Sequence, residues 1–209
     1  AVVESWNGTN WTETTDVNAS RSQIGGAGTQ TSALIFGGDR PADSPDTKAS
    51  TELWNGSNWT EVNDLNTARK GLTGSGLQPA ALAFGGSPAP VQASTELWNG
   101  TNWTAVNNMN TSRTSSIAGF GTTTSSIVTG GENPGGYTAN TELWNGTNWT
   151  ETTNLSAGGA KGYGAGTTSN GVAFGGEYGG SRSGNTFEWE AAGVAVGAWS
   201  TGGNMNTTR

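Results

Sequence analysis

The sequence predicts an all-β repeat protein, and three observations support this prediction. The phrase Trp-Asn-Gly-Thr/Ser-Asn-Trp occurs four times, and its first tryptophans follow one another at intervals of 44 to 48 residues. A Gly-Gly pair follows a short apolar run in each repeat. Nowhere does the chain of 209 residues show the apolar periodicity of a helix. A period of roughly 40–50 residues is typical of four-stranded propeller blades, so we expect a β-propeller of antiparallel blades.

The first two strands of each unit are predicted from their glycines. The first strand contains a Gly-x-Gly sequence that ends at Gly28, Gly76, Gly121 or Gly166, and its lack of bulk suits a crowded innermost strand. The second strand is an apolar run such as Ala81–Phe84, which is expected for a strand buried on both faces. The last glycine of Gly-x-Gly precedes the Gly-Gly pair by nine residues in every unit, so we expect a fixed register.

The outer two strands of each unit are predicted from the tryptophan phrase. Thr51–Trp54 exemplifies the third strand, and Trp59–Val62 exemplifies the fourth. The Asn-Gly sequence between them indicates a tight hairpin, because both central residues of a type I′ turn need a positive φ.

The tryptophans recur at the same place in every unit. Their positions are Trp6, Trp11, Trp54, Trp59, Trp98, Trp103, Trp144 and Trp149, with a degraded copy from Trp189 to Trp199. This recurrence favours packing between neighbouring blades, where a large ring buries much apolar area. The alternative is that some of the rings stack on sugars at the surface.

The combined pattern resembles the kelch repeat. That repeat has an apolar strand ending in Gly-Gly, a strand with a glutamate and an aromatic residue, a following tryptophan, and a closing apolar residue and arginine. One copy reads Gly85-Gly86, Glu96, Trp98, Trp103, Met109 and Arg113. The Asn-, Thr- and Gly-rich sequence of the repeats is similar to that of kelch-like proteins of marine phage and metagenomic origin. The resemblance implies a kelch propeller over nearly the whole chain, with tryptophan where many kelch blades have tyrosine.

The repeat divides the chain into one domain of five units. The expected units of the single domain 1–209 are a half blade 1–21 and complete blades 22–69, 70–113, 114–161 and 162–209. We therefore expect a five-bladed propeller with an incomplete first blade. The missing strands could come from an upstream extension or from a partner chain, or the first blade could be truly two-stranded. The open strand edges make self-association through the half blade a further expectation.

Composition argues against several function classes. The chain has no cysteine and no histidine, so it lacks disulfides, thiolate ligands and the commonest general base. Kelch propellers that resemble galactose oxidase need both residue types. Nine basic residues and a net charge of -7 argue against nucleic-acid binding, and no apolar run is long enough to insert into a membrane. We expect no cofactor, no metal and no enzymatic activity.

Acidic and basic residues also recur. Glu52, Glu96 and Glu142 stand two residues before a tryptophan, as does Glu4. The units close with Arg21, Arg69, Arg113 and Arg209, and Lys161 lies nearest that place in the fourth. The favoured interpretation is a Glu–Arg pair that joins strands or blades, since losing one partner would leave the other charge unpaired. The alternative is a ring of arginines that binds an anion at the channel mouth.

The loops after the Gly-Gly pairs differ while their flanks repeat. They cover residues 39–49, 87–93, 132–139 and 177–185. Binding residues are concentrated on loops that a rigid scaffold positions. The candidate binding residues on this face are Asp39, Arg40, Asp43, Glu132, Tyr137, Glu177, Tyr178 and Arg182.

These observations predict a non-enzymatic module for binding or structure. Low charge, absent cysteine and abundant Asn, Thr and Gly suit an extracellular or virion surface. Its partner would be a protein or a glycan that contacts the loop face. The alternative is a glycan-acting hydrolase, in which two carboxylates of the loops after the Gly-Gly pairs act as acid and base.

Overall fold

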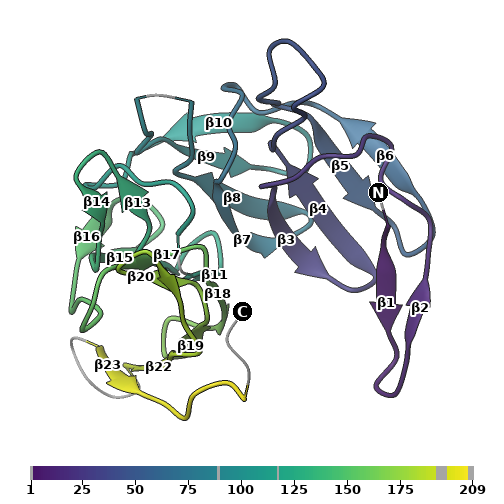
Figure 1. Ribbon diagram of the computed structural model, residues 1–209. Coiled ribbons are helices and arrows are strands. Elements are labelled where there is room, and N and C mark those ends of the chain that lie inside the picture. Colours follow the sequence, from purple (N-terminus) through teal and green to yellow (C-terminus); the bar gives the residue numbers. More distant parts are fainter. Residues whose placement is uncertain (1, 89, 117, 192–196, 207–209) are drawn as a thin grey trace.

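The computed structural model describes residues 2–88, 90–116, 118–191 and 197–206. Over these residues the protein is all-β, with no helix and hence none long and apolar enough to cross a membrane. Four antiparallel sheets of four strands follow one another along the chain, as the sequence predicts (Figure 1). A separate two-stranded hairpin precedes them.

The strands of each sheet pair in chain order. The first sheet holds β3 (Gly25–Thr29), β4 (Ser32–Phe36), β5 (Thr51–Trp54) and β6 (Trp59–Val62). The second holds β7 (Thr73–Leu77), β8 (Ala80–Phe84), β9 (Thr95–Trp98) and β10 (Trp103–Val106). The third holds β11 (Ala118–Gly121), β12 (Ser126–Thr129), β15 (Thr141–Trp144) and β16 (Trp149–Glu151). The fourth holds β18 (Tyr163–Gly166), β19 (Asn170–Phe174), β22 (Thr186–Glu190) and β23 (Ala198–Thr201).

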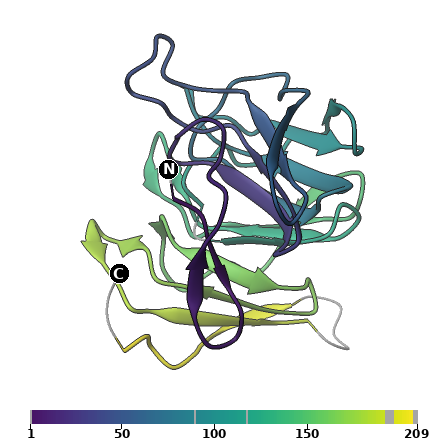
Figure 2. The same cartoon turned by 90° about the vertical axis from the view of Figure 1, so that its right-hand side faces the viewer.

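Shorter strands complete the fold. The N-terminal hairpin consists of β1 (Glu4–Trp6) and β2 (Trp11–Glu13). The loops of the third and fourth sheets contain β13 (Glu132–Asn133), β14 (Gly136–Tyr137), β17 (Gly159–Ala160), β20 (Glu177–Tyr178) and β21 (Ser181–Arg182). The β1–β2 hairpin stands at the N-terminal end of the arc of sheets and faces the viewer in Figure 2.

The second glycine of each Gly-x-Gly sequence explains the constant spacing to the Gly-Gly pair. Gly28 has a φ of +114°, and a Cβ there would lie 2.3 Å from the carbonyl oxygen of Ser32. Gly76 repeats this geometry, with a φ of +101° and 2.5 Å to the carbonyl oxygen of Ala80. A side chain would be strained in both conformation and space, so the turn between the first two strands allows only glycine.

The first strands of the four sheets lie innermost. β3, β7, β11 and β18 contact one another in chain order. Residues from all four sheets line one central cavity of about 340 Å³. A Cβ at Gly74 would lie 2.4 Å from the carbonyl oxygen of Gly26, which shows how closely neighbouring first strands approach. Glycine-rich first strands therefore let the four sheets approach one another closely around this cavity.

The core consists of apolar layers between successive sheets. Phe36 of the first sheet packs edge-on against Trp103 of the second, with ring centroids 4.9 Å apart. Phe84 of the second sheet repeats this contact with Trp149 of the third at 5.1 Å. A third layer around Phe120 joins the last two sheets. Each sheet is thus stabilised mainly by its neighbours.

The connections lie at two opposite ends of the strands. The Asn-Gly turns approach the turns between the first two strands, since a Cβ at Gly56 would lie 3.4 Å from the carbonyl oxygen of Thr31. The loops after the Gly-Gly pairs lie at the other end, where the amide of Gly38 donates to the carbonyl oxygen of Arg69 at 2.8 Å. We call the end with these loops and the connections between sheets the loop face.

Candidate functional site

In every phrase after the first, the first tryptophan is tied to its own sheet. The indole Nε1 of Trp98 donates to the carbonyl oxygen of Gln78 at 3.0 Å, at the tip of the β7–β8 turn. Trp54 makes the same bond to the carbonyl oxygen of Gln30 at 3.0 Å. Both rings are buried, so neither presents a face for sugar stacking.

In the third and fourth phrases, the second tryptophan reaches into the preceding sheet. Nε1 of Trp103 donates to the hydroxyl of Thr51 at 3.0 Å, and Nε1 of Trp149 donates to the hydroxyl of Thr95 at 3.0 Å. These residues serve the inter-sheet layers. Trp6 and Trp11 differ, because 42% and 64% of their surfaces are exposed.

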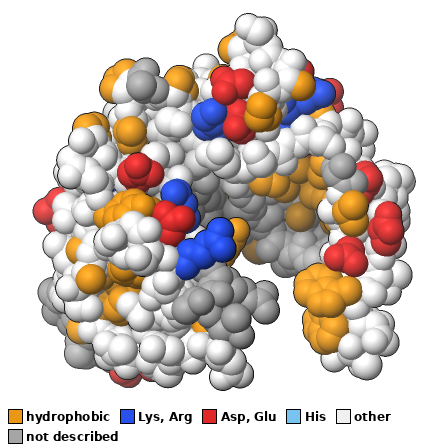
Figure 3. Space-filling view, viewed as in Figure 1, with side chains coloured by type: hydrophobic (Ala, Val, Ile, Leu, Met, Phe, Trp, Pro, Cys, Tyr) orange, Lys and Arg blue, Asp and Glu red, His pale blue; other side chains and the backbone are white. Residues whose placement is uncertain are grey.

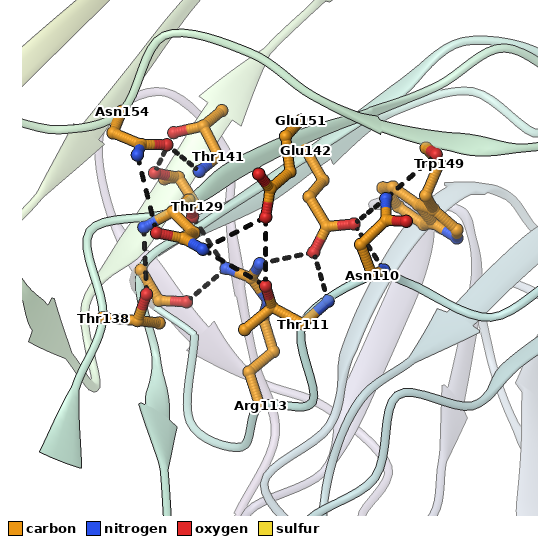
Figure 4. Close-up of polar contacts among 12 residues, drawn as sticks. Asn110, Thr111, Arg113, Thr129, Thr138, Thr141, Glu142, Trp149, Glu151 and Asn154 are labelled. Carbon is orange, nitrogen blue, oxygen red and sulfur yellow. Dashed lines mark hydrogen bonds and ion pairs between the residues drawn. The ribbon is translucent and has the colours of Figure 1, made fainter. Parts of the chain in front are cut away.

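A buried arginine forms an ion pair with a glutamate at each junction between the first three sheets. We call this arginine–glutamate pair the clamp. Arg113 donates from Nη2 to Oε1 of Glu142 at 2.6 Å, and from Nη1 to the carbonyl oxygens of Gly130 and Asn140 at 2.7 Å (Figure 4). The other carboxylate oxygen of Glu142 accepts from the backbone and side-chain amides of Asn110 at 2.7 and 2.9 Å. The arginine closes one unit and the glutamate lies in the next, so the pair joins two sheets.

The clamp recurs at the neighbouring junctions. Arg69 binds Glu96 at 2.8 Å with the same carbonyl contacts, and Arg21 pairs with Glu52 at 3.0 Å. Arg69 and Arg113 have no exposed surface, and burial lowers the pKa of both guanidinium groups against the opposing effect of the glutamates. Arginines without solvent access do not form an anion-binding ring. Arg209 lies outside the described residues.

At the end of the fourth unit, residues 114–161, an aromatic ring stands in place of the clamp. This is the junction between the third and fourth sheets. The backbone position of the arginine is occupied by Gly159, whose carbonyl oxygen accepts from Gly131 as that of Arg113 accepts from Gly86. A Cβ at Gly159 would lie 2.5 Å from the Tyr178 ring, so this ring takes up the space beside the glycine. Lys161, which sequence position suggested as the counterpart, lies two residues further on. Sequence reasoning missed this exchange because it appears only when backbone partners are matched.

The hydroxyl of Tyr178 is buried without a hydrogen-bond partner among the described residues, and burial raises its pKa to about 12. Tyr178→Phe should therefore raise the free energy of unfolding by about 1 kcal/mol, because it removes an unsatisfied polar group. Urea unfolding measures this change. In an alkaline absorbance titration of the variant, the ionisation of a tyrosine near pH 12 should be absent. Tyr137→Phe is the control, since that hydroxyl has a partner. Equal destabilisation by both variants would contradict the prediction.

The candidate loop residues form two groups rather than one site. In the first sheet, Asp43 binds Lys48 at 2.9 Å and Arg40 at 3.4 Å. Nearby, Lys70 bridges Asp39 at 3.2 Å and Asp46 at 2.9 Å. Figure 3 shows acidic and basic side chains lying beside one another in this way.

The second group joins the third and fourth sheets. Oε2 of Glu177 accepts from Nζ of Lys161 at 2.8 Å and from the hydroxyl of Tyr137 at 3.0 Å. Glu132 pairs with Tyr137 across β13–β14, and Arg182 pairs with Glu177 across β20–β21, so both lie beside this group. The structure thus places seven candidates on the loop face and turns Tyr178 inward.

Hydrogen bonds from lysines lower the pKa of three loop carboxylates. Lys48 lowers the pKa of Asp43, Lys70 lowers that of Asp46, and Lys161, with Tyr137 second, lowers that of Glu177. These groups therefore remain ionised near neutral pH. No cluster of three or more potential metal-ligating side chains occurs within the part of the chain that the structure describes.

The sheets, layers and clamps define an all-β repeat protein of four-stranded antiparallel sheets. No protein-family model matches the chain, and no curated protein matches it. Its fold is similar to that of YjhT, a solved structure, with a TM-score of 0.76 and 13% identity over 98% of this chain and 77% of that one. At this identity the likeness concerns the fold alone.

Proposed function

We propose that this protein is a non-catalytic β-propeller of kelch type, with an incomplete first blade, that binds a glycan through its loop face. Four sheets whose first strands surround one cavity support the propeller. The residues of the kelch-like pattern support the repeat type, since Gly-Gly, Glu, Trp and Arg make equivalent contacts in successive units. An extracellular or virion-surface setting belongs to the same proposal.

The contrast between repeated side chains and variable loops supports a binding role for the loop face. The repeated side chains are used in packing, whereas the loops after the Gly-Gly pairs differ in sequence and structure. Among the described loop residues, none of the large hydrophobic side chains is exposed. Protein-binding hot spots centre on aromatic and arginine anchors in desolvated pockets. The loops after the Gly-Gly pairs are polar and carry many hydrogen-bonding groups, which favours a hydroxyl-rich ligand.

The hydrolase alternative has less support. Its general acid needs a carboxyl group with a raised pKa. Asp43, Asp46 and Glu177 have lowered pKa values because each accepts a hydrogen bond from a lysine. A carboxylate that is held ionised is a poor proton donor at neutral pH.

A glycan array tests the proposal, followed by titration of the glycan that binds best. Tyr137→Ser combined with Lys161→Ser should weaken binding at least about tenfold, because it removes two groups of the second loop-face cluster. Thr101→Ala combined with Thr147→Ala is the control, since these exposed residues lie in Asn-Gly turns at the opposite end. Binding that is lost only in the control would contradict the loop face. Product release from the array glycans would favour the hydrolase.

A further inference from the structure

The Asn-Gly turns share one arrangement of the asparagine side chain. In the turn 99–102, Oδ1 of Asn99 accepts hydrogen bonds from the backbone amides of Thr101 and Asn102 at 2.9 and 2.8 Å. The other turns repeat both bonds at 2.8 or 2.9 Å, on Asn7, Asn55 and Asn145. Two amide donors on one carbonyl oxygen draw electron density from Cγ and stabilise negative charge that develops on that oxygen.

The residue after each of these asparagines is an exposed glycine. Gly56, Gly100 and Gly146 have φ values of +92°, +92° and +93°. Their backbone nitrogens donate no hydrogen bond among the described residues. Because glycine has no Cβ, nothing blocks the approach of its nitrogen to Cγ of the preceding asparagine. Each turn thus combines a polarised amide carbon, a nearby nitrogen without a hydrogen-bond partner, and access for water.

A further asparagine from the preceding sheet holds two of these turns. Nδ2 of Asn63 donates to the carbonyl oxygen of Thr101 at 3.0 Å and to Oδ1 of Asn102 at 2.8 Å. Asn107 makes the same two contacts with the turn 145–148, at 3.0 and 2.8 Å. We call Asn63 and Asn107 the latch asparagines.

The turn of the first sheet has no latch asparagine. The residue one repeat before Asn63 is Thr15, whose carbonyl oxygen accepts from Nε1 of Trp59 at 3.2 Å. Among the described residues, the side chain of Thr15 makes no hydrogen bond to the turn 55–58. Local opening costs less free energy where fewer contacts must break, so this turn opens more readily than the two latched turns.

Asn170 also precedes a glycine, but in a different setting. Gly171 lies within β19, between β18 and β22. A Cβ at Gly171 would lie 2.3 Å from the ring of Phe120. Strand pairing on both sides and this close packing hold the peptide group in place. Its nitrogen can turn toward Cγ of Asn170 only when the sheet opens.

We propose that the Asn-Gly turns are sites of spontaneous covalent modification, and that the latch asparagines set the order in which they react. The glycine nitrogen gives its proton to hydroxide and forms a bond to Cγ of the asparagine. The bond between Cγ and Nδ2 breaks, and ammonia leaves with its third hydrogen taken from water, so a succinimide ring forms. Water then opens the ring at either carbonyl carbon, which yields aspartate or isoaspartate and one new negative charge. Asn55 reacts before Asn99 and Asn145, and Asn170 reacts last.

Incubation of the intact chain in mildly alkaline buffer, followed by trypsin and mass spectrometry, tests the proposal. Cleavage after lysine and arginine places Asn55, Asn99, Asn145 and Asn170 in four different peptides. The reaction at Asn55 should be at least about threefold faster than at Asn99 or Asn145, the ratio that two exposed hydrogen bonds supply. In urea, where the turns are lost, the four rates should converge.

Three results would overturn the proposal. One is an equal rate at Asn55, Asn99 and Asn145 in the native chain. Another is a native Asn170 that reacts as fast as Asn55. The third is an Asn55 that stays intact in the native chain for as long as the unfolded chain needs to react fully.

Asn63→Thr tests the latch directly, because it places the residue of the unlatched turn beside a latched one. The rate at Asn99 should rise at least about threefold, and the rate at Asn145 should stay unchanged. Asn107→Thr is the matched control and should give the opposite result. Both latch asparagines are exposed, so we expect both variants to fold, which circular dichroism checks. An unchanged rate at Asn99, or an equal rise at both sites, would show that the latch does not set the order.

Discussion

Arg113→Met is expected to lower the free energy of unfolding by about 3–5 kcal/mol, because it leaves the buried carboxylate of Glu142 without its cation. Arg113 has no exposed surface and also donates to the carbonyl oxygens of Gly130 and Asn140. Methionine retains most of the side-chain volume, so the loss reports the polar contacts rather than a cavity. Urea unfolding at pH 7 with linear extrapolation measures the change.

Two further variants separate burial from charge. Lys161→Met removes the cation of the ion pair with Glu177, in which the lysine side chain is 49% exposed. This variant should lower the free energy of unfolding by no more than about 1 kcal/mol. Arg113→Met combined with Glu142→Leu should recover part of the loss, because no charge then stays unpaired. If Arg113→Met costs no more than Lys161→Met, the junction does not depend on the clamp.

The junction between the third and fourth sheets lacks the arginine in the natural sequence. Gly159 stands at the arginine position, and Glu188, which pairs with Val172 as Glu142 pairs with Val128, is exposed. Tyr178 supplies apolar bulk beside the glycine. The glutamate is thus solvated where the arginine is absent, so no charge stays buried and unpaired at this junction, just as none does in the double variant.

Trp149→Ala is expected to lower the free energy of unfolding by about 3–5 kcal/mol, as is typical of a large buried aromatic residue. Trp149 is 5% exposed, packs on Phe84 and donates to the hydroxyl of Thr95. Truncation leaves a cavity between the second and third sheets and an unsatisfied threonine hydroxyl. Denaturant unfolding followed by circular dichroism measures the loss.

Trp11→Ala is the matched control, since it changes the same position of the same phrase. Trp11 is 64% exposed, so its loss should change the free energy of unfolding by no more than about 0.5 kcal/mol in dilute solution. A loss as large as that of Trp149→Ala would mean that the first hairpin is covered in solution as the others are.

Much of the fold is readable from the sequence because its signals are local. The constant nine residues from Gly28 to Gly37 reflect one turn that tolerates only glycine, and this turn sets the register of β3 and β4. The loop 55–58 does the same for β5 and β6. It is not the predicted type I′ turn, because only Gly56 has a positive φ, and the Asn55 side chain instead accepts hydrogen bonds from the amides of Ser57 and Asn58. For the candidate site, sequence identified which loops vary, but it could not show that their charged residues form two groups, because Lys70 and Lys161 pair with carboxylates in the loop of another unit.

By itself, the sequence determined the unit: four antiparallel strands in chain order, with glycine-rich first strands and paired tryptophans, since turn chemistry and apolar pattern act within a few residues. Only the tertiary structure decided what surrounds each unit. Trp11 and Trp103 end the same phrase, yet one is exposed and the other is buried, because burial depends on the neighbouring sheet. Likewise, Arg113 and Glu142 are 29 residues apart and meet only because one sheet packs on the next.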